Sequence, residues 1–270
     1  MPNQPRLRKA LGQHHLRDGA RCLRAVEYLQ PAGRLVVEIG PGGGVLTREL
    51  LRAGAKVAAW EIDPAWAIEL SRRLRSPRLA IVVGDALELP WERLPAGSLV
   101  AGNLPFSVAT PILEGFLLRG LASPRAVLLV QDEVAQRLVA APGSRAYGFL
   151  TVTTAAVATI SVLERLSPGS FRPPPKVHGA MIGVARRPAP IVPIAEMAAF
   201  RETVSQAFSH RRKTLANSLG AARGRASATA AIEAAGLDPG RRAETLTLDE
   251  FVRLARSLRA GAGDREKKNL

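Results

Sequence analysis

The sequence predicts an α/β protein, with a mostly parallel β-sheet covered by helices on both faces and a small all-helical domain at the carboxyl terminus. Apolar runs alternate with segments of helical periodicity from Gly33 to about Arg187. A glycine-rich turn directly follows the first apolar run. Beyond residue 194 the chain keeps helical periodicity and contains no convincing strand. Its 270 residues, 47% of them hydrophobic, suffice for one large core and a smaller module.

The apolar runs and turn signals place the individual elements. Strands are expected over 34–39, 56–62, 80–83, 98–102 and 126–130, and helices over 45–54, 65–74, 111–118 and 132–140. The segment 186–193 is rich in Pro and Arg and is the best linker candidate. Helices are then expected at about 195–208, 212–220, 228–235 and 248–259, with a frayed tail over 261–270. We therefore expect domains at 1–188, including a basic amino-terminal lid segment over 1–32, and at 189–270.

The charge of the chain points to a polyanionic partner. The formal net charge is +15, and contacts of Arg and Lys with phosphates release condensed counterions. A genome rich in G and C would also raise the Arg content, so composition alone leaves both explanations open. The distribution favours nucleic acid, because residues 1–25 hold six basic side chains against the single acid Asp18, and 210–213 form a compact basic cluster.

Several other classes of protein are disfavoured. The single cysteine, Cys22, excludes an internal disulfide and a cysteine-cluster metal site, and no metal is expected. The chain has no run of eighteen apolar residues, and its amino terminus lacks the apolar stretch of a secretory signal. We therefore expect a cytoplasmic protein with no membrane partner.

The glycine-rich turn over 40–44 follows the first predicted strand. Its spacing, Gly-x-Gly-x-Gly, departs from the dinucleotide fingerprint, because Val45 occupies the sixth position. With the acidic Glu38 two residues before Gly40, the pattern suits the amino-acid and ribose part of S-adenosylmethionine better than a pyrophosphate. A tight turn that binds no ligand is the alternative.

Acidic residues follow the next two predicted strands. Glu61 stands where a carboxylate can accept hydrogen bonds from both ribose hydroxyls of a nucleoside. Asp85 follows the third strand and could accept from the adenine amine of the cofactor. Each could instead be an ordinary solvated strand-end charge or turn residue, but their order along the chain favours ligand binding.

The motif Asn103-Leu104-Pro105-Phe106 follows the fourth predicted strand. The amine of adenine is a poor nucleophile because its lone pair is delocalised into the ring. The side-chain carbonyl of Asn103 and the backbone carbonyl of Leu104 could accept hydrogen bonds from it, Pro105 would stiffen the loop, and Phe106 offers a face on which an extruded base can stack. Rate would then come from alignment and from acceptors aimed at the charge developing on nitrogen.

These motifs together resemble the KsgA/RsmA (Dim-type) small-subunit ribosomal RNA adenine N6,N6-dimethyltransferases. The resemblance runs through 11–18, 37–47, 60–63, 84–86, 102–113, 130–148, 171–177, 208–220 and 236–251, and so covers nearly the whole chain. It implies a Rossmann-like class I methyltransferase domain and a helical RNA-binding domain, acting as a monomer. It further implies S-adenosylmethionine as cofactor, and as substrate two adjacent adenosines in the 3′-terminal hairpin of 16S rRNA in an immature 30S subunit.

The resemblance also assigns roles to particular residues. It implies cofactor contacts at His14, Leu16, Gly40, Gly42, Glu61, Asp85 and Asn103. It implies catalysis at Asn103, Leu104, Pro105 and Phe106. It implies substrate contacts at Phe106, Phe171, Arg211, Arg212 and Lys213, with Arg241 and Arg242 also facing RNA phosphates; a solvated helix face is the alternative for these cations.

The chain departs from the family pattern at two places. The family usually has Gln-Asn-Phe-Leu where this chain has Gln13-His14-His15-Leu16, so an aromatic ring is replaced at His15. The family usually has Tyr where this chain has Phe106, which keeps the stacking face and loses the hydroxyl.

Two other functions stay open. One is a methyltransferase of the antibiotic-resistance type that acts on 23S rRNA adenine; the segments 208–220 and 241–246 favour the small-subunit branch instead. The other is a ribosome assembly factor that has lost catalysis, which the intact 103–106 motif disfavours. A nicotinamide-dependent reductase is disfavoured by the glycine spacing.

Overall fold

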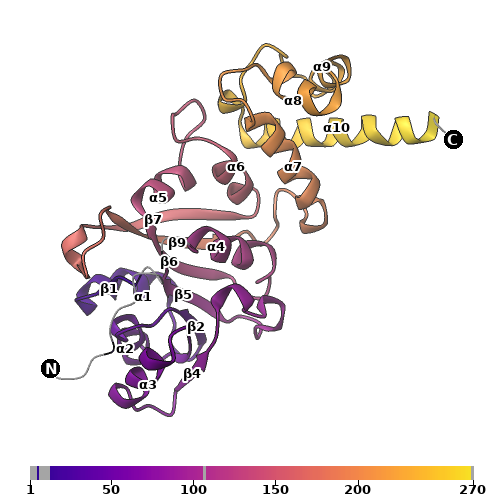
Figure 1. Cartoon of the computed structure of the whole chain (residues 1–270). Helices are drawn as coiled ribbons and strands as arrows, with labels where there is room; N and C mark the ends of the chain where they lie inside the picture. The colour runs from indigo at the N-terminus through magenta and orange to yellow at the C-terminus, as the bar shows by residue number, and fades with distance from the viewer. Residues whose placement is uncertain (1–4, 6–12, 106–107, 269–270) are drawn as a thin grey trace. The chain divides into compact units, whose positions relative to one another are not determined.

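The computed structural model describes residue 5 and residues 13–105 and 108–268, with side chains described as far as residue 260. The chain divides into two compact units (Figure 1). The first unit contains residues 1–135 and 159–187, and the second contains residues 136–158 and 188–270. The second unit therefore includes a segment that precedes the expected boundary at 188.

A seven-stranded sheet forms the first unit. Its strands are β2 (Leu35–Ile39), β3 (Lys56–Glu61), β4 (Leu79–Val83), β5 (Leu99–Asn103), β6 (Arg125–Gln131), β7 (Ala158–Leu166) and β9 (Gly179–Arg186). Their order is β4-β3-β2-β5-β6-β9-β7. A separate antiparallel pair joins β1 (His15–Leu16) to β8 (Phe171–Arg172). The structure thus confirms the predicted α/β sheet, and all five predicted strands are present.

The order of the parallel strands places the helices on both faces. The helices of this unit are α1 (Leu23–Leu29), α2 (Val45–Arg52), α3 (Pro64–Arg73) and α4 (Ala109–Leu118), and α5 (Asp132–Leu138) begins in it. Strands β2 to β6 pair in parallel. From β2 the chain adds β3 and β4 on one side, and it then returns to the other side of β2 to add β5 and β6. Right-handed crossovers therefore place α2 and α3 on one face and α4 on the other.

Two strands at one end of the sheet lie outside the predicted set. β9 pairs antiparallel with β6 from Arg125↔Ala185 to Gln131↔Gly179. The apolar run over 150–160 predicts either a strand or a core helix; in the structure it is divided between α6 (Phe149–Ala155) and the start of β7. Periodicity alone cannot separate these two outcomes in a short apolar run.

The second unit is helical, as predicted for the carboxyl-terminal part. It contains α6, α7 (Met197–Phe208), α8 (Leu215–Arg223), α9 (Arg225–Ala234) and α10 (Leu248–Lys268). α10 continues beyond its predicted end near 259, so the segment expected to fray is helical as far as Lys268. Phe208 stacks on Phe251 with 5.6 Å between ring centroids, and the Tyr147 ring meets Phe208 edge-on at 6.1 Å. These aromatic contacts form part of the core of this unit.

Candidate active site

One pocket gathers the carboxyl ends of β2, β3, β4 and β5. The parallel register pairs Ile39 with both Trp60 and Gly102, so the residues that follow these strands meet at one edge of the sheet. We call this the strand-end pocket. Its lining includes nine of the residues assigned from the sequence: His14, Gly40, Gly42, Glu61, Asp85, Asn103, Leu104, Pro105 and Phe171. Residues predicted from separate motifs therefore share one cavity.

The glycine turn requires glycine at several positions. Gly40, Gly42 and Gly44 have φ of 66°, 49° and 74°, in the left-handed region that side chains disfavour. A Cβ atom on Gly42 would lie 2.5 Å from Nε2 of His15, and one on Gly44 would lie 2.5 Å from a methyl group of Leu70. The turn therefore packs closely on both sides and presents backbone instead of side chains to the pocket.

Glu61 ties this turn to the end of β3. The side chain is 4% exposed; Oε2 accepts from the backbone N–H of Gly42 at 3.0 Å, and Oε1 accepts from that of Asp63 at 3.0 Å. Burial raises the pKa of this carboxyl, while the two backbone N–H groups act in the opposite direction. Each oxygen keeps a second lone pair, so the carboxylate can hold the turn and still accept from a ligand.

Glu38 lies beneath the turn and not on the strand-end pocket. It is 1% exposed, and burial raises the pKa of its carboxyl to about 8. It lines a small cavity with Pro41, His15 and Asn103. Glu38 therefore lies beside the glycine turn, and this acid, which helped to identify the motif, does not face the strand-end pocket.

Asp85 caps the turn after β4. Its Oδ1 accepts from the backbone N–H of Leu87 at 2.9 Å, at the start of a short 3₁₀ turn over Ala86–Glu88. Gly84 before it admits the Trp60 ring, since a Cβ there would lie 2.9 Å from the indole nitrogen. Asp85 is thus held at the pocket edge by its own turn.

The amide of Asn103 has a defined orientation. It ends β5, and its Nδ2 donates to the backbone carbonyl of His14 at 2.9 Å. Because a carbonyl can only accept, the nitrogen must face His14, and the side-chain oxygen is left as an acceptor. Leu104 is buried at 2% exposure, and the carbonyl of Pro105 accepts from the N–H of Val108 at 3.0 Å. Phe106, the predicted stacking residue, lies outside the described residues.

The amino-terminal segment reaches the pocket through β1. Leu16 pairs with Phe171, and Nδ1 of His14 lies 2.8 Å from the carbonyl oxygen of Pro173. His14 lines the pocket, whereas the Leu16 side chain is 6% exposed and belongs to the core of the unit. Phe171 is 2% exposed and reaches the pocket from that core.

The His15 ring packs as an aromatic ring at the position where the family pattern usually has Phe. Its ring meets the Trp66 ring edge-on, with centroids 4.4 Å apart, and covers Gly42. Burial, with a smaller contribution from His14, lowers the pKa of His15 to about 4. The imidazole is therefore neutral near pH 7 and acts as an aromatic ring.

The sequence interpretation missed several residues on the pocket wall. They are Gln13, His15, Ile39, Trp60, Ile62, Ala86, Val108 and Ile112. Ile62 is 43% exposed although it is apolar, and the buried indole nitrogen of Trp60 has no hydrogen-bond partner within the described structure. An apolar side chain directly after Glu61 was a signal that could have pointed to a flat apolar ligand group.

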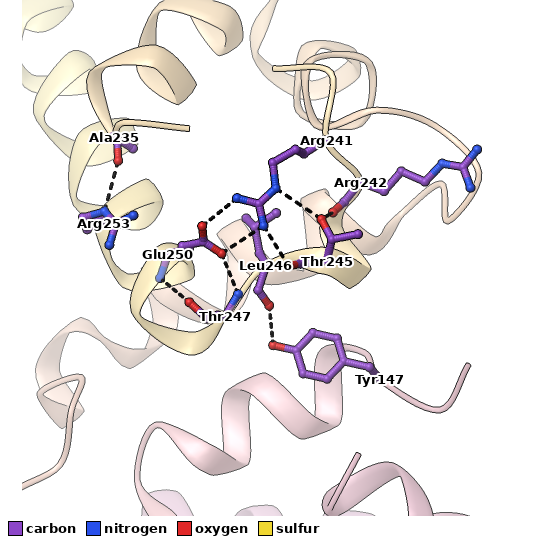
Figure 2. Close-up of polar contacts among 9 residues, drawn as sticks. All are labelled: Tyr147, Ala235, Arg241, Arg242, Thr245, Leu246, Thr247, Glu250 and Arg253. Carbon is purple, nitrogen blue, oxygen red and sulfur yellow. Dashed lines mark hydrogen bonds and ion pairs between the residues drawn. The ribbon is translucent and has the colours of Figure 1, made fainter. Parts of the chain in front are cut away.

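The basic residues of the second unit differ in their environments. Arg241 is held by Glu250 through two contacts of 2.6 and 3.1 Å, and it also donates to the carbonyl of Thr245 at 2.8 Å (Figure 2). Its guanidinium is therefore held by a bidentate carboxylate inside the unit, and its contact with RNA phosphates stays a prediction. Arg242 contributes its backbone carbonyl to this cluster and extends its side chain away (Figure 2).

The predicted cluster over 211–213 lies between α7 and α8. Arg211 donates to the carbonyl of Arg145 at 2.9 Å and pairs with Glu244 at 3.3 Å. Arg212 and Lys213 are exposed, and no carboxylate among the described residues pairs with them. Two of the three cations thus stay available to a partner.

The described residues contain no group of three or more His, Cys, Asp and Glu side chains that could hold a metal ion. Within the same part of the chain, no helix is long and apolar enough to cross a membrane.

A parallel sheet with a glycine turn after one central strand and an acidic residue at the end of the next defines a class I S-adenosylmethionine-dependent methyltransferase. The chain matches the family model described as ribosomal RNA adenine dimethylase over residues 4–260, and it belongs to that family. It is therefore an enzyme that methylates adenine in ribosomal RNA with S-adenosylmethionine as methyl donor.

Similar proteins agree with this assignment. Ribosomal RNA small subunit methyltransferase A of Synechococcus sp. is 41% identical over 263 residues, covering 93% of this chain and 92% of the relative. The protein of the same name from Geobacter metallireducens is 38% identical over 269 residues, covering 96% and 98%. Among solved structures, 23S rRNA methyltransferase ErmE is 27% identical with a TM-score of 0.70, covering 90% of this chain and 99% of that one. A dimethyladenosine transferase from Plasmodium falciparum has a TM-score of 0.81 at 20% identity, covering 92% and 98%, and shares the fold.

Proposed function

We propose that this enzyme transfers methyl groups to the N6 amines of two adjacent adenosines in the 3′-terminal hairpin of 16S rRNA, in an immature 30S subunit. Identities near 41% to small-subunit methyltransferases, against 27% to a 23S rRNA methyltransferase, favour the small subunit. The observation that carries the catalytic part is the oriented amide of Asn103 on the strand-end pocket. We further propose domains at 1–188 and 189–270, a monomer, and a cytoplasmic location.

The lining of the strand-end pocket fits S-adenosylmethionine. The backbone of Gly40 and Gly42 gives polar groups for its amino-acid part, and Glu61 offers acceptor lone pairs for ribose hydroxyls. Ile62 provides an apolar wall for its adenine, with Asp85 at the edge for the amine. When bound, the cofactor supplies an electrophilic methyl group on a sulfonium.

Asn103 and the residues after it prepare the amine of the substrate. The side-chain oxygen of Asn103 and the backbone carbonyl of Leu104 accept the two N–H bonds of the amine and turn its lone pair toward the methyl group. The nitrogen would become positive as the methyl carbon leaves the sulfonium sulfur for it, which would leave a neutral thioether, and both acceptors are already in place for the charge on nitrogen. The proton then leaves to solvent through an acceptor oxygen. Phe106 stacks on the base, Phe171 is a second residue that packs against the base, and Arg211, Arg212 and Lys213 contact RNA phosphates.

The decisive experiment is transfer of labelled methyl groups. Purified enzyme is incubated with labelled S-adenosylmethionine and small subunits that lack these methyl groups, and the RNA is then analysed by mass spectrometry. We expect two dimethylated adenosines in the 3′-terminal hairpin and no label in 23S rRNA from large subunits. Label in 23S rRNA alone would support the resistance-type alternative. Binding to small subunits without any transfer would support an assembly factor that has lost catalysis.

A further inference from the structure

A second pocket in the first unit adjoins the strand-end pocket at His15, whose ring lines both. Four arginines line it, Arg17 after β1, Arg48 on α2, Arg73 on α3 and Arg172 on β8. We call it the four-arginine pocket. Its volume of about 290 Å³ is large enough for a phosphate group together with water. Four separate segments of the chain therefore each contribute one arginine to the lining of this pocket.

Three of these four cations lack the carboxylate partners that other arginines of the unit have. Arg21 pairs with Glu164 at 2.8 Å, and Arg165 pairs with Asp132 at 2.8 Å. Within the described residues, Arg17, Arg48 and Arg172 have no carboxylate at ion-pair distance, and no acidic side chain lines the pocket. Arg73 has one long contact with Glu69, at 3.8 Å.

A cluster of like charges around a hollow raises the local potential and favours an anion there. The guanidinium group binds phosphate oxygens through two parallel N–H bonds and keeps its charge at every physiological pH. Gly43 and Val45, at the start of α2, complete the wall, and the amino end of a helix adds to the positive potential that the arginines establish.

We infer that the four-arginine pocket binds a backbone phosphate of the substrate RNA beside the adenosine whose base enters the strand-end pocket. The inference rests on the proposed function, because it needs an RNA chain at that pocket. A single residue, His15, separates the two sites, so a nucleotide held in one has its neighbouring phosphate in reach of the other. The phosphate contact fixes the register of the strand and leaves base recognition to the strand-end pocket.

The test compares two double variants of the full-length enzyme that each lose two positive charges from the first unit. Arg17→Gln with Arg48→Gln removes two cations of the four-arginine pocket. The matched control, Arg72→Gln with Arg75→Gln, removes exposed cations at the end of α3 and just after it that do not line the pocket. Binding of a synthetic hairpin with the 3′-terminal loop sequence is measured by fluorescence anisotropy over a range of salt concentrations. Calorimetric binding of S-adenosylmethionine confirms that each variant is folded.

The pocket variant should bind the hairpin about five- to tenfold more weakly, and its salt slope should fall by about 0.7 to 0.9, the value for one phosphate. The control should stay within about twofold of the wild type with an unchanged slope. Equal weakening in both variants, or none in either, would overturn the inference. A second result would also overturn it: inorganic phosphate stabilises the wild type but not the pocket variant, while both bind the hairpin equally well. The pocket would then hold a free anion and not a phosphate of the RNA.

Failure of the proposed function gives a different result. If the wild type neither binds the hairpin nor methylates small subunits, the RNA substrate itself is wrong. If the wild type binds and methylates but the two double variants behave alike, only the role of the four-arginine pocket is wrong.

Discussion

The strand ends of the first unit and the basic turns of the second unit behave in opposite ways. At the strand ends, residues far apart in the sequence meet: Gly42 and Glu61 are joined by a hydrogen bond, and Asn103 reaches the carbonyl of His14. In the second unit, arginine side chains that look alike in the sequence have different environments. Arg241 is bound by Glu250, while Arg212 is exposed without a carboxylate partner among the described residues.

The difference lies in what determines the position of each group. A parallel sheet brings the carboxyl ends of its strands to one edge, so the backbone alone brings the functional groups together. A charge on a helix or loop takes its role from whichever side chain the fold places beside it. Strand-end substitutions should therefore change chemistry and ligand binding strongly, whereas substitutions of the exposed cations should have small effects on stability.

The largest effect is expected at Asn103. Asn103→Ala removes the oriented acceptor from the amine, and loss of one such preorganised group typically costs about 10²–10³ in rate. Methyl transfer should therefore fall at least a hundredfold, measured as single-turnover incorporation of label into undermethylated small subunits.

The binding of S-adenosylmethionine to the same variant serves as the control. It should stay measurable by calorimetry, because the glycine turn and Glu61 are unchanged. Turnover equal to that of the wild type would exclude Asn103 as the acceptor for the amine.

The next largest effect is expected at Glu61. Glu61→Ala removes the acceptor of the Gly42 N–H as well as the proposed ribose contact, and a hydrogen bond to a charged group contributes about 1.5–3 kcal/mol. Cofactor affinity should fall about ten- to hundredfold, measured by calorimetry. Glu88→Ala, at an exposed acid that does not line the pocket, should leave the affinity unchanged. Equal affinity in Glu61→Ala and the wild type would contradict the ribose assignment.

Much of this arrangement follows from the sequence. The five predicted strands are present, and the register of β2, β3 and β5 places the glycine turn, Glu61 and Asn103 on one pocket. A two-residue strand has no periodicity from which burial can be predicted, so the sequence did not indicate that the Leu16 side chain lies in the core; its cofactor contact stays a prediction. The ion pair of Arg241 depends on how the chain folds over residues 242–249, which brings Glu250 back to Arg241. No local pattern in the sequence indicates that contact.

The pKa values of His15 and Glu38 predict a pH profile of stability with two opposed contributions. The pKa of His15 is lowered from 6.5 to about 4, so its contribution is present above pH 6.5 and is lost as the pH falls toward 4. The pKa of Glu38 is raised from 4.5 to about 8, so its contribution is present below pH 4.5 and is lost as the pH rises toward 8. Each slope is about 1.4 kcal/mol per pH unit inside its window.

Between pH 4.5 and 6.5 the two slopes cancel, and single variants should reveal them. His15→Phe keeps an aromatic ring against Trp66, and its unfolding free energy should fall steadily from pH 4.5 to 8. Glu38→Gln should show a rise from pH 4 to 6.5 and then a plateau. Urea unfolding at several pH values measures both. Parallel profiles for the wild type and both variants would mean that neither group titrates as its burial implies.

The smallest effects separate the cations of the second unit. The ion pair of Arg241 with Glu250 is bidentate, with side chains 31% and 18% exposed, so its coupling energy should be about 1 kcal/mol in a double-mutant cycle with Arg241→Ala and Glu250→Ala. Arg212→Ala should change the unfolding free energy by less than about 0.5 kcal/mol and should weaken RNA binding instead. If Arg212→Ala destabilised the protein as much as Arg241→Ala, the exposed cation would have a structural role as well, and the two kinds of cation would no longer be distinct.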